Sequence, residues 1–284
     1  MRTKQEMYNL ILNQAKSNPH VHLVAMNGSR TNPNIKPDDF QDYDIVYIVD
    51  DIDYFLQRPQ WVDVFGKRCI MQLPDDMKLF PSSKNGWYAY LMLFEDGNRI
   101  DLTLIPMKDL ENYLRNDKLL KILWNRDLDL PYIGISSDID YHIKKPCADY
   151  FNDCCNEFWW TTTYVIKGLC RNEMLYALHH LECCVREQLF QMMAWYIGIE
   201  TNFSISVGKC FKFLPDKLPK EDREALMSTY KTSTTTECLE ALLTCMALFR
   251  KYSHLVSDHF GYPYPQEDEK VTHYISRMCD LYLK

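Results

Sequence analysis

The spacing of apolar residues changes near Pro146, and this change constrains the fold more than any other feature of the chain. Before it, short runs rich in β-branched and aromatic residues, such as Val21 to Met26 and Tyr43 to Val49, predict strands. After it, apolar residues recur three and four positions apart, which is typical of long helices. We therefore predict an α+β protein with a mixed sheet and flanking helices over residues 1–135 and an all-α helical bundle over residues 136–284.

The expected elements follow these patterns. In the first half, helices are predicted over residues 4–15, 52–55 and 61–65, and strands over 21–26, 43–49, 69–72, 87–95 and 99–105. In the second half, helices are predicted over residues 147–168, 173–197, 220–230, 236–260 and 267–281. Asp96-Gly97 joins the last two strands, and Asp-Gly favours a type I′ hairpin turn, whose two central residues both have positive φ. This hairpin places Asp101 on a strand antiparallel to the one before it.

The composition excludes several classes of protein. With 46% hydrophobic residues the chain is not disordered. Without an apolar signal core or a run of about 18 apolar residues, it is expected to be a soluble cytoplasmic protein with no membrane partner. Its eleven cysteines include no CxxC pair and lie mostly in apolar helical segments, so we expect free thiols. The net charge of −7 argues against a nucleic-acid partner and is compatible with a cationic substrate.

Three aspartates interrupt or border apolar strand patterns. Asp42 and Asp44 face the same side of a strand if it extends that far, and Asp101 can join them from a neighbouring strand. A lone carboxylate inside an apolar run is costly unless it has a metal. Converging carboxylates without basic partners repel one another, and a hard divalent cation removes that cost. Mg²⁺ prefers oxygen ligands and keeps positions for water and phosphates, so we predict that these three aspartates bind Mg²⁺.

The pair Gly28-Ser29 closes the strand that precedes these aspartates. Glycine allows the backbone to approach a phosphate, and the Ser29 hydroxyl and amide can donate hydrogen bonds to it. Taken singly, a Gly-Ser pair is usually a turn and an Asp-x-Asp sequence is usually a solvated strand end. Their combination with Asp101 favours a site for phosphoryl-group chemistry.

Several strings of residues resemble the aminoglycoside 6-adenylyltransferases, the streptomycin-modifying enzymes of the DNA polymerase β-like nucleotidyltransferase superfamily. They are MNGSRTNPN (26–34), FQDYDI (40–45), FEDGNRIDLTLI (94–105), DCCNEFW (153–159), YVIKG (164–168) and VGKCFK (207–212). Together they extend through nearly the whole chain. The resemblance implies an N-terminal nucleotidyltransferase domain, a C-terminal helical domain and ATP-dependent transfer of AMP to the streptidine 6-hydroxyl of streptomycin, which confers antibiotic resistance.

The family pattern implies a role for each matching residue of this chain. Nucleotide binding is implied for Gly28, Ser29, Arg30, Lys167 and Lys209, with the two lysines on the triphosphate. Metal binding, and with it catalysis, is implied for Asp42, Asp44 and Asp101. ATP is the expected co-substrate and Mg²⁺ the expected metal. The alternative for the lysines is a solvated helix face.

The string YALHHL (176–181) departs from the family pattern, which has an aspartate where this chain has His179. That aspartate is the expected general base for the drug hydroxyl. Histidine can accept a proton near neutral pH, but it offers no negative charge to a guanidinium group. Glu182 lies three residues further on the same helix face and can substitute in part. The alternative is that His179 is a helix-surface residue of a diverged or weakened enzyme.

Two other functions remain open at this stage. The chain is either a nucleotidyltransferase with another acceptor, such as a different aminocyclitol or a protein hydroxyl, or a nucleotide-binding regulator that has lost turnover. The preference for ATP over GTP and the choice between monomer and homodimer are also open.

Overall fold

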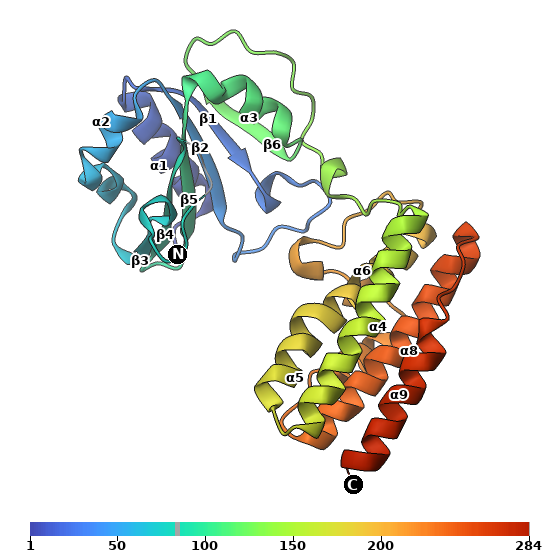
Figure 1. Cartoon of the computed structure of the whole chain (residues 1–284). Coiled ribbons are helices and arrows are strands. Elements are labelled where there is room, and N and C mark those ends of the chain that lie inside the picture. Colours follow the sequence, from blue (N-terminus) through green and yellow to red (C-terminus); the bar gives the residue numbers. More distant parts are fainter. Residues whose placement is uncertain (83–85, 284) are drawn as a thin grey trace. The chain divides into compact units, whose positions relative to one another are not determined.

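The first half of the chain forms a mixed sheet, as the strand patterns predict. The computed structural model describes residues 1–82 and 86–283, and within them six strands form a sheet in the order β3-β4-β5-β2-β1-β6 (Figure 1). The strands are β1 (Val21–Asn27), β2 (Tyr43–Val49), β3 (Arg68–Gln72), β4 (Tyr88–Phe94), β5 (Arg99–Pro106) and β6 (Leu120–Asn125). Strands β2 and β5 are parallel, whereas the other neighbouring pairs are antiparallel. The predicted mixed sheet is confirmed.

Helices cover both faces of this sheet (Figure 1). They are α1 (Lys4–Ser17), α2 (Ile52–Leu56) and α3 (Leu110–Asn116), with a 3-10 helix at Pro59–Phe65. On the α1 face, the hydroxyl of Tyr47 donates a 2.6 Å hydrogen bond to the carbonyl of Ile11. On the other face, Val46 packs in one cluster with Tyr113 of α3. Because residues two apart on a strand share a face, Asp44 projects from the face that α3 covers.

The hairpin of β4 and β5 is confirmed, but its turn is not of the predicted type I′. Gly97 has a φ of 84°, whereas Asp96 does not take a positive φ. The Gly97 N–H donates to the Phe94 carbonyl and the Phe94 N–H to the Asn98 carbonyl, both at 2.9 Å, as in a three-residue loop with one left-handed residue. The Asp96 carboxylate accepts from the Asn98 N–H and from Arg2 Nε, at 3.0 and 2.6 Å. Arg2 is far from the turn in sequence, so the local pattern did not indicate this contact.

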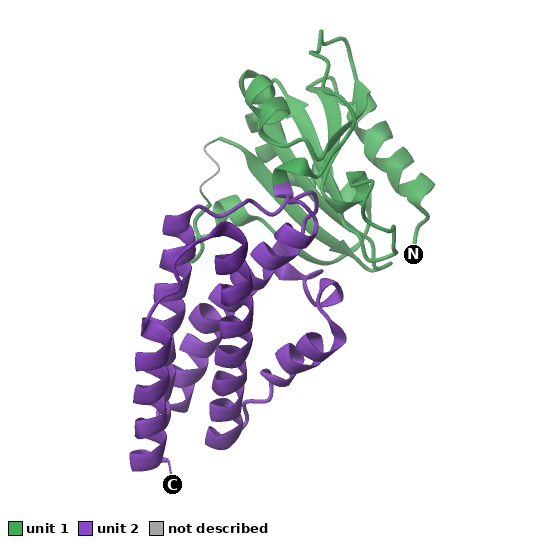
Figure 2. Cartoon of the chain, turned by 90° about the vertical axis from the view of Figure 1, so that its right-hand side faces the viewer, with its two compact units in different colours: residues 1–140 green, residues 141–284 purple. Residues whose placement is uncertain are grey.

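The described residues divide into two compact units, residues 1–140 and residues 141–284 (Figure 2). The sheet belongs to the first unit. In the second unit, every regular element that the structure describes is a helix, which confirms the predicted change from a mixed sheet to helices. The predicted boundary between residues 135 and 136 lies close to this division. The functions predicted for the two domains stay predictions.

The second unit is built from helices packed around an apolar core that includes several aromatic rings. They are α4 (Ala148–Cys170), α5 (Met174–His180), α6 (Arg186–Glu200), α7 (Lys220–Ser228), α8 (Thr235–Phe260) and α9 (Glu267–Tyr282). The ring of Phe158 on α4 stacks on Phe249 of α8 with centroids 3.7 Å apart. Helix α8 begins at a capping box formed by Thr234 and Glu237 and ends at Gly261, which has a φ of 69°.

One predicted helix is interrupted in the structure. The apolar spacing predicts a single α-helix over residues 173–197, but a π-helical segment, Leu181–Val185, separates α5 from α6. A π segment widens the helix locally without breaking it, so the apolar spacing of three and four continues on both sides. Such segments are frequent at functional sites, and this one includes Glu182 and follows His179 closely.

Two properties of the described residues concern the cysteines and the membrane. Each of the eleven cysteines lies in the described part of the chain and is a free thiol, and Cys183 is exposed instead of sharing the expected apolar setting. None of the described helices is both long enough and apolar enough to cross a membrane.

Candidate active site

Asp44 and Asp101 lie side by side near the start of the two parallel strands. They are register partners between β2 and β5, so their side chains project from the same face of the sheet. Asp42 comes just before β2 begins at Tyr43, so the regular strand does not extend to it. Its carboxylate nevertheless shares a partner with Asp101, namely Arg99. The structure thus brings the three aspartates together, while their role stays a prediction.

Gly28 brings the backbone against one of these carboxylates. It has a φ of +73°, which L side chains rarely adopt, and a Cβ built on it would lie 2.1 Å from Oδ2 of Asp44. Only glycine therefore fits here without a shift of the carboxylate. Gly28 also starts a 3-10 turn, Ser29–Thr31, in which the Thr31 N–H donates to the Gly28 carbonyl at 3.0 Å.

Arg30 holds the segment that leads into β2. Its Nε donates to the Asp42 carbonyl at 3.0 Å and its Nη2 to the Gln41 carbonyl at 2.6 Å. Its guanidinium lies 3.8 Å from the centre of the Tyr43 ring, which is a cation–π contact. The Gln41 amide in turn donates to the Ser29 carbonyl at 3.2 Å. These bonds fix the backbone on both sides of Asp42, so the contacts of Arg30 are those of a positioning residue.

Arg99 supplies a positive charge that the sequence reasoning missed. Its Nε and Nη2 donate to the two carboxylate oxygens of Asp101, each at 2.8 Å, and its Nε lies 3.7 Å from Oδ2 of Asp42. The expectation of carboxylates without a basic partner is therefore wrong. The spacing of Arg99 and Asp101 could have indicated the contact, because residues two apart on a strand project from the same face.

The charges of this cluster act on one another. Burial raises the pKa of Asp42, the positive charge of Arg99 opposes this increase, and the negative charge of Asp101 adds to it. The hydrogen bonds to Asp101 raise the pKa of Arg99. Arg30 also opposes the increase in the pKa of Asp42, so two guanidinium groups act on this carboxylate.

The donor chemistry fits a hard divalent cation, but the arrangement as it stands does not. Carboxylate oxygens are the ligands that Mg²⁺ prefers. Within residues 1–82 and 86–283, however, no three His, Cys, Asp or Glu side chains are arranged so that they could hold a metal ion. The guanidinium of Arg99 occupies both carboxylate oxygens of Asp101. Mg²⁺ bound by these aspartates would therefore lie close to that positive charge.

The two candidates for the general base lie in different settings in the second unit. His179 is exposed, and its Nδ1 lies 3.8 Å from the Cys183 sulfur. Glu182 forms an ion pair with Arg186, whose side chain is only 3% exposed. Arg186 also donates from Nε to the Thr229 hydroxyl at 3.2 Å. Glu182 therefore neutralises a buried cation, a contact with a clear structural role.

The two lysines predicted to bind the triphosphate also differ in their surroundings. Lys167 on α4 places its Nζ 4.8 Å from the ring centre of Tyr164 and 5.4 Å from that of Tyr176. Lys209 is exposed in a 3-10 turn that follows Gly208, whose φ is 76°. Binding of the triphosphate by Lys167 and Lys209 stays a prediction.

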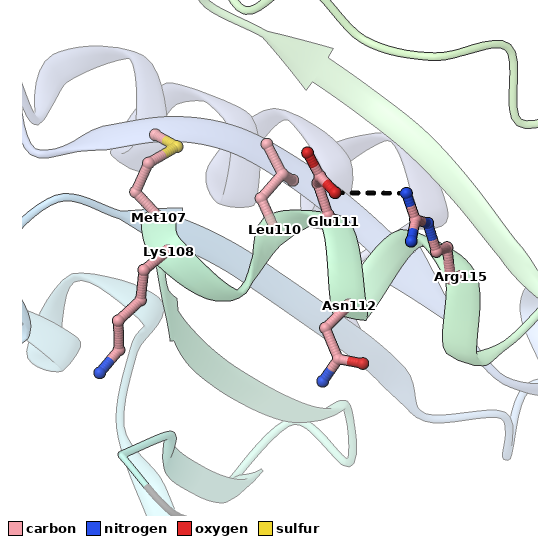
Figure 3. A pocket seen from close by; sticks show the side chains of 6 residues that line it. All are labelled: Met107, Lys108, Leu110, Glu111, Asn112 and Arg115. Atoms are coloured by element: carbon pink, nitrogen blue, oxygen red, sulfur yellow. Dashed lines mark hydrogen bonds and ion pairs between the residues drawn. The ribbon is translucent and has the colours of Figure 1, made fainter.

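Two cavities in the first unit lie at other places. One, of about 490 Å³, runs along α3 and is lined by Met107, Lys108, Leu110, Glu111, Asn112 and Arg115 (Figure 3). Glu111 and Arg115 form an ion pair across one turn of α3 at 3.3 Å. The other, of about 620 Å³, is lined by residues that include Asp50, Asp53, Trp87 and Tyr88. No residue with a predicted role lines either cavity.

Comparison with known proteins identifies the family. The family model described as streptomycin adenylyltransferase matches residues 1–278. The chain is 48% identical to the aminoglycoside 6-adenylyltransferase of Bacillus subtilis (strain 168), over 96% of this chain and 97% of that protein. It is 46% identical to the enzyme of the same name from Campylobacter jejuni, over 99% and 98% of the two chains. A crystal structure of an aminoglycoside 6-adenyltransferase from Bacillus subtilis is 44% identical, covers 98% of this chain and 99% of its own, and gives a TM-score of 0.49. The chain therefore belongs to the streptomycin adenylyltransferase family.

Proposed function

We propose that this protein transfers AMP from ATP to a hydroxyl of an aminoglycoside, namely the 6-hydroxyl of streptomycin, and so confers resistance. Family membership over residues 1–278 supports the reaction type, and relatives 40–48% identical bear the name aminoglycoside 6-adenylyltransferase. Within the molecule, the proposal is carried by Asp44 and Asp101, which lie in register, and by Gly28, whose backbone lies against Asp44. Paired carboxylates next to a glycine turn suit the transfer of a phosphorus-centred group.

In the proposed reaction, the acceptor oxygen attacks the α-phosphorus of ATP. A new O–P bond forms, the bond between the α-phosphorus and the oxygen that bridges to the β-phosphate breaks, and pyrophosphate leaves. The hydroxyl proton passes to a base of the protein. The product carries an anionic AMP group in place of a hydroxyl, so both the charge and the size of the cationic drug change.

The residues proposed for nucleotide binding are those that match the family pattern. The Ser29 amide and hydroxyl would donate to a phosphate, and Lys167 and Lys209 would act as point charges on the β- and γ-phosphates. Asp42, Asp44 and Asp101 would hold Mg²⁺ once Arg99 has left them. That ion, when bound, supplies positive charge for the developing charge on the phosphates.

His179 is the favoured base and Glu182 the second candidate. Glu182 is paired with the buried Arg186 and neutralises its charge, so its contacts already have a structural role. The imidazole of His179 is exposed, and the Cys183 sulfur lies 3.8 Å from its Nδ1. We also propose that the protein acts in the cytoplasm on small molecules and not on nucleic acid, since its net charge of −7 disfavours phosphate backbones.

Incubation with labelled ATP, Mg²⁺ and a panel of aminoglycosides tests the function. AMP-streptomycin as the main product supports the proposal. If AMP is transferred to a different acceptor instead, that acceptor and not streptomycin is the substrate. Nucleotide binding without any product indicates a regulator that has lost turnover.

The role of the aspartates is tested by Asp44→Asn. The variant should fold normally and lose at least nine-tenths of the transfer rate, because it removes one ligand charge while relieving repulsion among the carboxylates. A variant that keeps more than about a tenth of the wild-type rate, a loss of under roughly 1.4 kcal/mol in barrier height, excludes Asp44 as a metal ligand.

A further inference from the structure

The carboxylate cluster contains its own positive charge, and that charge is placed to compete with a metal. The guanidinium of Arg99 bonds both oxygens of Asp101 at 2.8 Å and reaches to 3.7 Å from Asp42. A bidentate pair of this kind uses both oxygens of the carboxylate in a fixed geometry. A metal that takes Asp101 as a ligand must use at least one of the same oxygens.

The side chain of Arg99 can leave this position. It is 41% exposed, in contrast to Arg186, which is 3% exposed and bonded to Thr229 inside the second unit. The ion pairs of Arg99 go to aspartates of the cluster itself. Moving the guanidinium into solvent therefore breaks contacts within the cluster without opening a buried core. Such partly exposed pairs are individually weak, so a doubly charged ion can replace one.

We propose that Arg99 is a resident counter-ion of the site, which holds the aspartates together when no metal is bound and which a divalent cation must displace. The proposal rests on the function proposed above, because it takes Asp42, Asp44 and Asp101 as the metal ligands. A doubly charged cation on these carboxylates would lie close to the guanidinium, and like charges so close repel one another. Arg99 thus stabilises the metal-free protein and weakens its affinity for free divalent cations. It is a positioning residue, since it acts through the carboxylates.

Arg99→Gln separates the effect of Arg99 on the stability of the metal-free protein from its effect on the affinity for divalent cations. Without the guanidinium, the carboxylates repel one another in EDTA, so the melting temperature should fall below that of the wild type. The same variant should bind Mn²⁺, followed by electron paramagnetic resonance without nucleotide, at least tenfold more tightly. Added Mn²⁺ should then narrow the difference in melting temperature between the two proteins. Arg99→Lys, which keeps the charge but not the two-pronged geometry, should have an intermediate Mn²⁺ affinity.

Arg2→Gln is the matched control. Arg2 forms a similar partly exposed ion pair with Asp96, at 2.6 Å. Asp96 lies in the loop that leads into β5, the strand that carries Arg99. This variant should also lose thermal stability, but its Mn²⁺ affinity should equal that of the wild type. A parallel Mn²⁺ titration of Asp44→Asn reports whether the aspartates bind the ion at all.

Two results would overturn the inference. The first leaves the proposed metal ligands in place, and the second rejects them as well. If Arg99→Gln and the wild type bind Mn²⁺ equally and Asp44→Asn binds it less, Arg99 is an ordinary ion-pair partner and the proposed metal ligands stand. If no variant changes Mn²⁺ binding, Asp44→Asn included, both Arg99 and the metal ligands are wrongly assigned. The assay with labelled ATP then decides separately whether the protein transfers AMP.

Discussion

At the scale of single residues, the site depends on the close approach of Gly28 to Asp44. The backbone at position 28 is left-handed, and the space where a Cβ would stand is filled by a carboxylate oxygen. A side chain here would therefore carry a cost in backbone strain and a second cost in steric overlap. The steric overlap would displace Asp44, a predicted metal ligand.

Gly28→Ala should consequently impair transfer more than stability. We expect a loss of about 1–3 kcal/mol in the free energy of unfolding from the strained backbone, and a fall in rate on the order of 10²-fold because a displaced carboxylate misplaces the reacting groups. Gly134→Ala is the matched control, since Gly134 has the same φ of +73° and a Cβ added to it would meet nothing within 4 Å. It should share the stability loss and keep the rate. Equal rates in the two variants would contradict the role of Gly28.

His179 and Glu182 can be separated by comparing rate with stability. If His179 is the base, His179→Ala should lower kcat on the order of 10²–10⁴-fold and leave the melting temperature unchanged, because its side chain is exposed. Glu182→Gln should keep most of the rate but lower the melting temperature, because it leaves the buried Arg186 without its carboxylate. Steady-state kinetics and thermal melts on both variants check this, and the reverse result would make Glu182 the base.

At the scale of elements, much of the fold could be predicted because its signals are local. The sequence predicts a strand over residues 43–49 and β2 is found over Tyr43–Val49, since its run of β-branched and aromatic residues suits a strand that packs in apolar clusters on both faces. By contrast, α3 has seven residues, too few for a helical period to stand out, and the sequence patterns predict neither it nor β6.

The candidate site was predictable only as far as its residues lie on well-predicted strands. The strand patterns place Asp44 and Asp101 together, and their register is now seen. The partners that set the electrostatics were missed: Arg99 beside Asp101, and Arg186 beside Glu182. The spacing of Arg99 and Asp101 indicates a shared face of the strand, but the packed structure is needed to show that this arginine pairs with the aspartate and is not a solvated surface residue.

The loop between β4 and β5 gives a prediction about pH. Hydrogen bonds from the Arg2 side chain lower the pKa of Asp96 below its ordinary value of 3.8. A carboxylate whose folded pKa is lowered stabilises the protein above the unfolded pKa, and this contribution is lost as the pH falls through the folded pKa. Thermal melts of the wild type should therefore show a stability loss below about pH 4. Asp96→Asn should be less stable at neutral pH and show a shallower loss in acid. An identical acid limb in both proteins would exclude this contribution.

At the scale of the whole molecule, the proposed roles are distributed over both units. The metal ligands belong to residues 1–140 and the lysines to residues 141–284. Lys167→Ala and Lys209→Ala should each raise the KM for ATP and leave that for streptomycin unchanged, because a lysine on a phosphate acts on the nucleotide alone. Steady-state kinetics with each substrate varied in turn would show this. A rise in the streptomycin KM alone would place these lysines at the acceptor.

The parallel pairing of β2 with β5 also has a consequence for folding. The strands β3 and β4 lie between them in sequence, so Asp44 meets Asp101 only after a long segment has closed, whereas the hairpin of β4 and β5 can form from local contacts. A slip of one residue in this late pairing would turn Asp44 toward the apolar face under α1, where a carboxylate is costly. The aspartates proposed for catalysis therefore also select the correct strand register. A chain with apolar residues in their place would be more prone to pair β2 and β5 in the wrong register.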